Sequence, residues 1–275
     1  MSQRPDMISI TVQRATAGEP VADQVVVEEP LEIRVDGQAL AVLMRTPGRD
    51  ADLTAGFLLT EGVVEVPGDL QSHGPCTDPN RPNAGNVYLA QLAPGCPDAT
   101  ERLAAAQRQL YASSSCGLCG KATIESIHQR VTPHADFRGV PRALLATLGD
   151  RASVAQDLFR QTGGCHGAMA LGLDGDAPLL ASAEDVGRHN AVDKVVGSLL
   201  LADALPQHDA LLWVSGRASF EMVQKALMAG FAALVCVGAP TSLAVEMARE
   251  SRLTLVGFAT GPERYNVYAG SVDDT

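Results

Sequence analysis

Short apolar strands alternate with amphipathic helices in the last third of the chain, and this alternation constrains the fold most. Strands are predicted at Ala210–Val214, Ala233–Val237 and Leu253–Phe258, separated by helices at Phe220–Ala229 and Ser242–Glu250. Continuous apolar strands are buried on both faces, and helices between successive strands are typical of a parallel sheet. We therefore predict an α/β domain whose sheet is covered by helices on both sides.

A hairpin and a helix are predicted just before that alternation. Met169–Leu173 and Leu179–Ser182 flank the turn residues Asp174–Pro178, and Asn190–Ala204 has helical apolar spacing. The charged block Ala183–Lys194 connects this hairpin to the helix. Because ligand-binding loops lie at strand ends of an α/β sheet, the block is a candidate site. The alternative is a solvated turn with internal ion pairs.

The first half of the chain is richer in strand and turn signals. Its predicted elements are strands at Leu31–Val35 and Ala39–Met44 around the turn Asp36-Gly37, a helix between Asp50 and Gly62, a strand at Asn86–Leu92, and a short helix at Ala122–Arg130. Residues 68–97 are dense in Pro, Gly, Asn and Asp and are predicted to form a boundary or linker. Arg102–Leu110 fits either helix or strand.

The composition is that of a globular protein rather than a nucleic-acid-binding or membrane protein. Apolar residues make up 46% and charged residues 19% of the 275 residues, and the formal net charge is −11. Such a chain lacks the excess of Lys and Arg that displaces counterions from nucleic acid. Met1–Arg14 has no continuous apolar stretch like that of a signal peptide, and the longest apolar runs are too short to span a bilayer. We expect a soluble, cytoplasmic protein.

Cys116 and Cys119 form the sharpest chemical motif, within Ser-Ser-Ser-Cys-Gly-Leu-Cys-Gly-Lys. They precede a predicted helix, and the amides and dipole at a helix start lower the pKa of a thiol. Since the thiolate is the reactive form, we predict a reactive cytosolic thiol pair. The alternative is half of a zinc site, but the sequence contains no second Cys-x-x-Cys and no His-x-x-x-His. His166 could complete such a site only through tertiary folding, and we predict no metal.

Three predicted strand-end loops have the features of an anion-binding pocket. Ser215–Glu221 and Gly238–Ser242 each follow an apolar strand and open a helix, where free amides suit a phosphate. Gly257–Arg264 follows the last strand, and Arg217 adds positive charge. If the strand ends are aligned, these loops lie together. We predict a pocket for an anionic ligand such as a nucleotide.

Several motifs follow one another in order from about Arg45 to Tyr265. They are Arg45-Thr-Pro-Gly48, Gly56-Phe-Leu58, Glu61-Gly62, Ser114–Lys121, Thr162–His166, Glu184–Ala191 with Asp193-Lys194, Ser215-Gly-Arg217 and Pro240-Thr241. Together they resemble one known family, the formate dehydrogenase accessory sulfurtransferases called FdhD. The Cys-Gly-x-Cys-Gly and Glu-Asp-Val-Gly-Arg-His-Asn blocks are specific in combination.

The resemblance implies a fold and an assembly. The main domain would be similar to cytidine deaminase and occupy residues 111–275, and a smaller β-rich domain with one helix would occupy residues 1–110. Family members act as cytoplasmic homodimers. Deaminase activity is not expected, because the His-x-Glu and Pro-Cys-x-x-Cys signature is absent from the sequence.

The resemblance also implies sulfur transfer. Family members take sulfur from a cysteine desulfurase as a cysteine persulfide. They deliver it to the bis-molybdopterin guanine dinucleotide form of the molybdenum cofactor before its insertion into formate dehydrogenase. Carried onto this sequence, Cys116 bears the persulfide and Cys119 is its partner, in a role left open. The cofactor-binding segment falls on Phe258, Ala259, Thr260, Gly261, Pro262 and Glu263.

Two other hypotheses are retained. One is a zinc-binding protein that uses Cys116, Cys119 and His166, and the other is a non-catalytic chaperone that only holds the nucleotide-bearing cofactor. The sequence assigns no role to His166, Arg188, His189 or Arg217.

Overall fold

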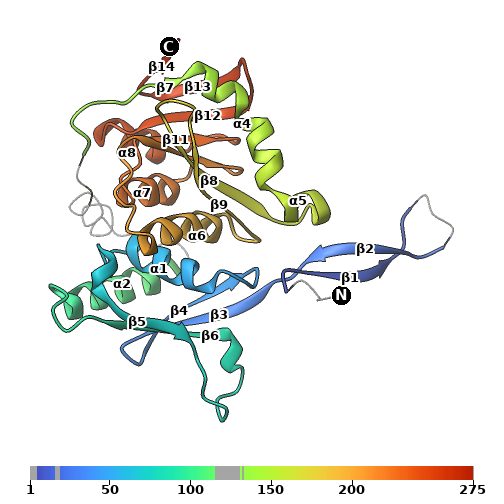
Figure 1. Cartoon of the computed structure of the whole chain (residues 1–275), viewed down its shortest axis with the longest axis vertical. Coiled ribbons are helices and arrows are strands. Elements are labelled where there is room, and N and C mark those ends of the chain that lie inside the picture. Colours follow the sequence, from blue (N-terminus) through green and yellow to red (C-terminus); the bar gives the residue numbers. More distant parts are fainter. Residues whose placement is uncertain (1–4, 16–18, 115–130, 132, 275) are drawn as a thin grey trace.

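Two sheets dominate the computed structural model, which describes residues 5–15, 19–114, 131 and 133–274 (Figure 1). The strands are β1 Met7–Val12, β2 Val21–Val26, β3 Glu29–Val35, β4 Gln38–Arg45, β5 Leu70–Pro75, β6 Val87–Leu92, β7 Val140–Pro141, β8 His166–Gly172, β9 Leu179–Asp185, β10 Ala210–Val214, β11 Ala233–Cys236, β12 Thr254–Gly261, β13 Arg264–Ala269 and β14 Val272–Asp273. The helices are α1 Asp50–Thr60, α2 Ala99–Ser114, α4 Arg142–Ala155, α5 Asp157–Thr162, α6 Arg188–Leu201, α7 Phe220–Met228 and α8 Ser242–Glu250, with 3-10 turns at Pro67–Asp69 and Ala84–Asn86. The mixed α/β class predicted from the sequence is confirmed.

The larger sheet has six strands in the order β13-β12-β11-β10-β8-β9. β10, β11 and β12 are parallel, as predicted, so their carboxyl ends share one edge. β8 runs antiparallel to β10 and to β9. Consequently the first residue of β8, His166, and the last residue of β9, Asp185, lie at that same edge.

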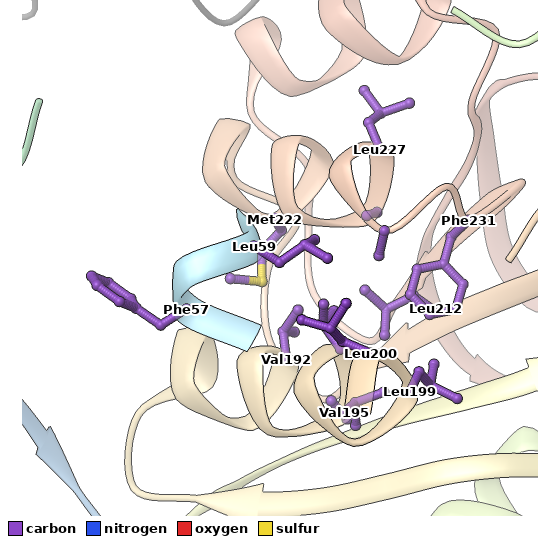
Figure 2. Packing of buried hydrophobic residues seen from close by; sticks show 14 of the residues in the cluster. Phe57, Leu59, Val192, Val195, Leu199, Leu200, Leu212, Met222, Leu227 and Phe231 are labelled. Carbon is purple, nitrogen blue, oxygen red and sulfur yellow. The ribbon is translucent and has the colours of Figure 1, made fainter. Parts of the chain in front are cut away.

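Both faces of this sheet are covered, as the alternation of strands and helices predicted. Leu212 and Val214 of β10 belong to the core shared with α6, α7 and α8, whereas Leu211 and Trp213 belong to the core shared with α4. Figure 2 shows part of the first core, with Leu212 beside side chains of α6 and α7. Helix α4 was not predicted, and it supplies most of the second layer (Figure 1).

The smaller sheet has the order β4-β3-β6-β5, and helix α1 connects it to the larger unit. The predicted hairpin of β3 and β4 and the predicted helix α1 are both confirmed. α1 packs against α6 at a crossing where a Cβ on Gly56 would overlap the carbonyl oxygen of Asp193. A Cβ on Gly197 would likewise overlap the carbonyl oxygen of Asp52. Glycine at both positions therefore lets the two helix backbones touch.

Several segments differ from their predictions. Residues 68–97 contain β5 as well as the predicted strand, so this segment is built into the smaller sheet rather than only linking elements. α2 settles the open choice at Arg102–Leu110 in favour of helix. Gly257–Arg264 was predicted as a loop, but β12 continues to Gly261 and turns directly into β13. The predicted helix Ala122–Arg130 lies outside the described residues, and the division at residues 110 and 111 stays a prediction.

The β1–β2 hairpin projects from the rest of the molecule (Figure 1). Ile8 and Ile10 on β1 are exposed along it. Among the helices in the described part of the chain, none has the length and apolar character needed to cross a membrane.

Candidate functional site

Backbone hydrogen bonds connect the segments at the carboxyl ends of β10, β11 and β12, the first to the second and the second to the third. The amide of Gly238 donates to the carbonyl of Gly216 over 2.9 Å, and the amide of Phe258 donates to the carbonyl of Gly238 over 3.1 Å. Ala218 and Pro240 also form a parallel bridge. We call residues 166, 187–189, 215–221, 238–241 and 258–263 the loop edge. The predicted proximity of these three segments is confirmed, although the third belongs to β12 and its turn into β13 rather than to a loop.

Two glycines allow neighbouring segments of the loop edge to approach closely. A Cβ on Gly216 would lie 3.3 Å from Cδ of Arg188, and a Cβ on Gly238 would lie 3.0 Å from Cα of Arg217. The start of α6 therefore packs against the loop after β10, and that loop packs against the loop after β11. This contiguity joins the block around Arg188 to the predicted pocket, a connection that the sequence alone did not make.

His166 is held at the loop edge by Ser215. The Ser215 Oγ accepts a hydrogen bond from the Gly167 amide at 3.0 Å and lies 3.2 Å from Nδ1 of His166. Burial lowers the pKa of His166, and the nearby charges of Arg188 and His189 lower it further. His166 is therefore a neutral histidine at pH 7, hydrogen-bonded within its Gly-rich bend.

A contact between His189 and Glu221 connects the first turns of α6 and α7. Nε2 of His189 lies 2.7 Å from Oε2 of Glu221. The hydrogen bond from His189 lowers the pKa of Glu221 against the opposing effect of burial, and Lys225 and Arg188 add to the lowering. Glu221 is thus ionised at neutral pH, and it fixes His189 across the gap between the two helices.

Apart from Nε2 of His189, which lies 2.7 Å from Glu221, two buried polar atoms at the loop edge have no hydrogen-bond partner among the described residues. They are Nε of Arg188, in the first turn of α6, and Oγ of Ser219, the N-cap position of α7, whose side chain makes no capping hydrogen bond. Arg217, between these two helices, is exposed. A buried donor without a partner costs free energy, so these atoms mark a place where a ligand or water completes the bonding.

The predicted cofactor-binding segment lies at the far end of the loop edge. Phe258–Gly261 form the end of β12, and Pro262 and Glu263 form the turn into β13. Phe258 has a φ of 55° and is 43% exposed. A left-handed backbone is unusual for an aromatic residue, and it is held here by the hydrogen bond to Gly238.

Most charges of the block Ala183–Lys194 are buried and structural. Nζ of Lys194 lies 2.7 Å from Oδ2 of Asp185, and the two side chains are 2% and 0% exposed. Asn190 donates to the same carboxylate over 2.9 Å. Nζ of Lys225 on α7 lies 2.8 Å from Asp193. The alternative prediction, a solvated turn with internal ion pairs, is correct in that the charges are paired. It is wrong in that Asp185, Asp193 and Lys194 are buried rather than exposed to solvent. Only Arg188 and His189 of this block reach the loop edge.

Cys116 and Cys119, the predicted reactive thiol pair, lie outside the described residues. The four other cysteines have free thiols, and Cys165 and Cys236 are buried. Burial raises the pKa of both, and Glu184, whose Oε1 lies 3.4 Å from Sγ of Cys165, adds to the shift there. Within the described ranges, no three side chains of His, Cys, Asp or Glu gather as metal ligands would.

Comparisons with known proteins agree on one family. A family model described as FdhD/NarQ matches residues 26–273. The chain is 47% identical over 258 residues to the sulfur carrier protein FdhD of Anaeromyxobacter dehalogenans, covering 92% of this chain and 88% of that one. It is 48% identical over 257 residues to the protein of the same name from Streptomyces avermitilis, covering 90% and 88%.

A solved structure supports the same assignment. A crystal structure of a protein assigned as a formate dehydrogenase accessory protein, from Desulfotalea psychrophila, superimposes with a TM-score of 0.70 at 25% identity and covers 96% of both chains. The family resemblance noted in the motifs is thereby confirmed over nearly the whole sequence. The chain belongs to the FdhD/NarQ family.

Proposed function

We propose that this protein accepts sulfur from a cysteine desulfurase as a persulfide on Cys116 and delivers it to the bis-molybdopterin guanine dinucleotide form of the molybdenum cofactor, to activate a formate dehydrogenase. The observation that carries the proposal is the 47% identity, across 92% of the chain, to a sulfur carrier protein. The structural relative assigned as a formate dehydrogenase accessory protein supports the choice of the final partner.

Loading is a thiol–disulfide exchange. The Cys116 thiolate attacks the outer sulfur of the donor's persulfide, and a new S–S bond forms. The S–S bond within the donor breaks, and the donor cysteine departs as a thiolate that takes up a proton. Sulfur is thus moved without any external oxidant or reductant.

Three of the four described cysteines are poorly suited to this step. The attacking species is the thiolate, and a raised pKa lowers its population. The pKa values of Cys96, Cys165 and Cys236 are all raised, in each case mainly by burial. These three thiols are therefore weaker candidates, and the sequence motif carries the proposal that Cys116 and Cys119 are the sulfur-carrying pair. The role of Cys119, as second carrier or resolving thiol, is decided by the experiment below.

The loop edge is the proposed binding place of the sulfur acceptor. Phe258–Glu263 would contact its nucleotide part, and the cationic side chains at the other end of the loop edge suit its phosphates. The proposal also includes a homodimer in the cytoplasm and a domain over residues 111–275 similar to cytidine deaminase.

Intact-protein mass spectrometry after incubation with a cysteine desulfurase and cysteine tests the proposal. The expected result is an added sulfur on the wild-type chain and on a Cys76→Ala control, which removes a partly exposed thiol. The adduct should vanish in Cys116→Ala. Its persistence in Cys119→Ala would assign Cys119 a resolving role. An adduct that forms equally in the double variant of Cys116 and Cys119 would overturn the proposal, as would stoichiometric zinc bound through Cys116 in the purified protein.

A further inference from the structure

The β1–β2 hairpin, which projects from the molecule, has one apolar face and one polar face (Figure 1). Residues directly opposite each other in an antiparallel pair share a face, and so do alternate residues of one strand. The register therefore gathers on one face Ile8, Ile10, Val12, Val21 and Val25, with Asp23 as its only charged member. The opposite face carries the polar residues Ser9, Thr11 and Gln24. One side of the hairpin thus has the composition of a buried surface.

The apolar face of the hairpin is nevertheless left open to solvent by the described residues. No residue of β1 or β2 is fully buried, and Ile8 and Ile10 are 53% and 39% exposed. The hairpin is attached to the molecule through its other face, where the side chain of Val26 packs against Gly164. A two-stranded hairpin without further packing is only marginally stable in water. The hairpin therefore gains stability from any surface that covers Ile8 and Ile10.

A second open apolar surface lies between α4 and the edge strand β9. It is a recess of about 310 Å³, which we call the α4–β9 recess, and its apolar lining consists of Val154, Ala155, Met169, Leu171 and Leu179. Val154 and Leu179 are 78% and 52% exposed. The volume is at the lower end of the range for ligand pockets, and the lining offers few polar groups to orient a ligand. The recess therefore suits the apolar side chains of another protein surface better than a cofactor.

The hairpin and the recess adjoin each other on the molecule. Helix α5 contacts both β2 and α4. Ala155, at the end of α4, lines the recess and also a small cavity that includes Asp6, the residue before β1. Phe159 on α5 is 45% exposed and adds an apolar side chain to the same region. Because the two surfaces adjoin, two copies related by a two-fold axis beside α5 can each place the hairpin in the recess of the other.

The charges beside the two surfaces are complementary. On the hairpin, Oδ1 of Asp23 lies 3.9 Å from Nη2 of Arg14, a distance that balances its charge only weakly. At the recess, Arg151 donates to the backbone carbonyls of residues 176 and 177, and no carboxylate among the described residues pairs with it. A contact between Asp23 of one copy and Arg151 of another would pair both charges. Such complementarity favours one partner and one register over others.

We infer that the apolar face of the β1–β2 hairpin, centred on Ile10, docks in the α4–β9 recess of a second copy of this chain, so that two chains exchange hairpins across a two-fold axis. The occupant is a second copy because the chain itself carries both halves of the contact, an apolar ribbon and an apolar recess with opposite charges beside them. The inference rests on the proposed function in that it assigns a surface to the proposed homodimer. Each dimer contains the contact twice, so each substitution removes two contacts.

Analytical ultracentrifugation of the full chain over a range of concentrations tests the docking. Ile10→Ser and Val154→Ser should each raise the dissociation constant of the dimer by about 100-fold or more, because two buried aliphatic contacts are lost at roughly tenfold each. Asp23→Arg should raise it by roughly 3- to 30-fold through repulsion from Arg151. Combining Asp23→Arg with Arg151→Asp should recover most of that loss, because the pair is restored with its charges reversed.

Val42→Ser is the matched control, since it removes a valine that is 64% exposed on β4 of the smaller sheet, and it should leave the dissociation constant unchanged. Circular dichroism of each variant shows that the dissociated chain is still folded. A monomeric wild type at every concentration, a dimer unaffected by Ile10→Ser and Val154→Ser, or a charge-reversed pair that does not recover would overturn the docking. Sulfur loading of Cys116 in the same preparations reports separately on the proposed function, because loading by a chain that forms no such dimer would leave the sulfur transfer standing.

Discussion

The carboxylate of Asp185 accepts several buried hydrogen bonds where the segment after β4 meets the larger sheet. Its oxygens accept from the Thr46 amide at 3.1 Å and from the Gly187 amide at 2.8 Å, and Lys194 neutralises its charge. Lys194 also donates to the carbonyl of Thr46 over 2.9 Å. A buried charge strongly destabilises the folded state when its partner is removed. The pair is therefore a structural requirement of the family motif rather than a reactive group.

Lys194→Met should lower the free energy of unfolding by about 3–5 kcal/mol, because it leaves the Asp185 charge buried without compensation. Urea unfolding followed by circular dichroism measures the change. Arg138→Met, which removes an exposed ion pair with Asp174, should cost less than about 1 kcal/mol. Equal losses in the two variants would contradict the structural role assigned to Lys194.

His166 should titrate below its ordinary pKa of about 6.5, because burial and the charges of Arg188 and His189 disfavour the protonated ring. Folding lowers this pKa, so the unfolded chain binds the proton more tightly. The stabilisation is present above pH of about 6.5 and is lost as the pH falls below it. NMR titration of the imidazole resonances should give a low value in the wild type and a higher one in Arg188→Gln. A wild-type value above 6.5 would show that the ring is not held as described.

At the scale of elements, the crossing of α1 and α6 determines how closely the two sheets approach. Gly56 and Gly197 let backbone meet backbone there, and the buried pair of Asp193 and Lys225 adds α7 to the contact. Figure 2 shows Leu59 of α1 close to Met222 of α7 and Val192 of α6 in the core beside this crossing.

Gly56→Ala should destabilise the protein by about 1–3 kcal/mol, because the added methyl meets backbone atoms of Asp193 and Gly197 that cannot rotate away. Gly149→Ala is the matched control, since it lies within α4 and a Cβ there meets nothing within 4 Å. It should stabilise the protein by about 0.5–1 kcal/mol through helix propensity. Thermal unfolding of both variants measures the difference. Opposite signs are expected, and a shared sign would refute the close helix contact.

Elements whose identity depends on local pattern could be predicted from the sequence, and those that depend on distant pairing could not. The buried strands β10 and β11 are continuous apolar runs with turn residues after them, so the sequence predicts them to within one residue, whereas β12 continues three residues past its predicted end at Phe258. β13 is an exposed edge strand with alternating polar residues, and it exists because β12 pairs with it. α4 carried a usable signal in the spacing of Leu144, Leu148 and Ala152, which all face the sheet.

At the scale of the whole molecule, the distinction between local pattern and distant pairing also explains which parts of the loop edge could be predicted from the sequence. Parallel strands implied that the loops after β10, β11 and β12 share an edge. The antiparallel pairing of β8 with β10, which adds His166, joins residues 49 positions apart at the Ser215 contact and leaves no mark in sequence spacing. The approach of Arg188 to Gly216 follows from that pairing. The loop edge is thus a product of tertiary structure, although its segments lie in motifs that the sequence shows.

The two sheets should unfold together. The core that includes Leu31 and Ile33 of β3 continues through α1 to Leu212 of β10. The buried pairs Lys194–Asp185 and Lys225–Asp193 form hydrogen bonds across the same junction, to Thr46 and Thr60 respectively. Trp213, the one tryptophan in the sequence, is buried in the larger sheet and reports on its unfolding by fluorescence. Native-state hydrogen exchange of the β3 amides reports on the smaller sheet. We expect the two methods to give the same free energy of unfolding, and exchange of β3 at a clearly lower free energy would instead mean that the smaller sheet opens as a separate unit.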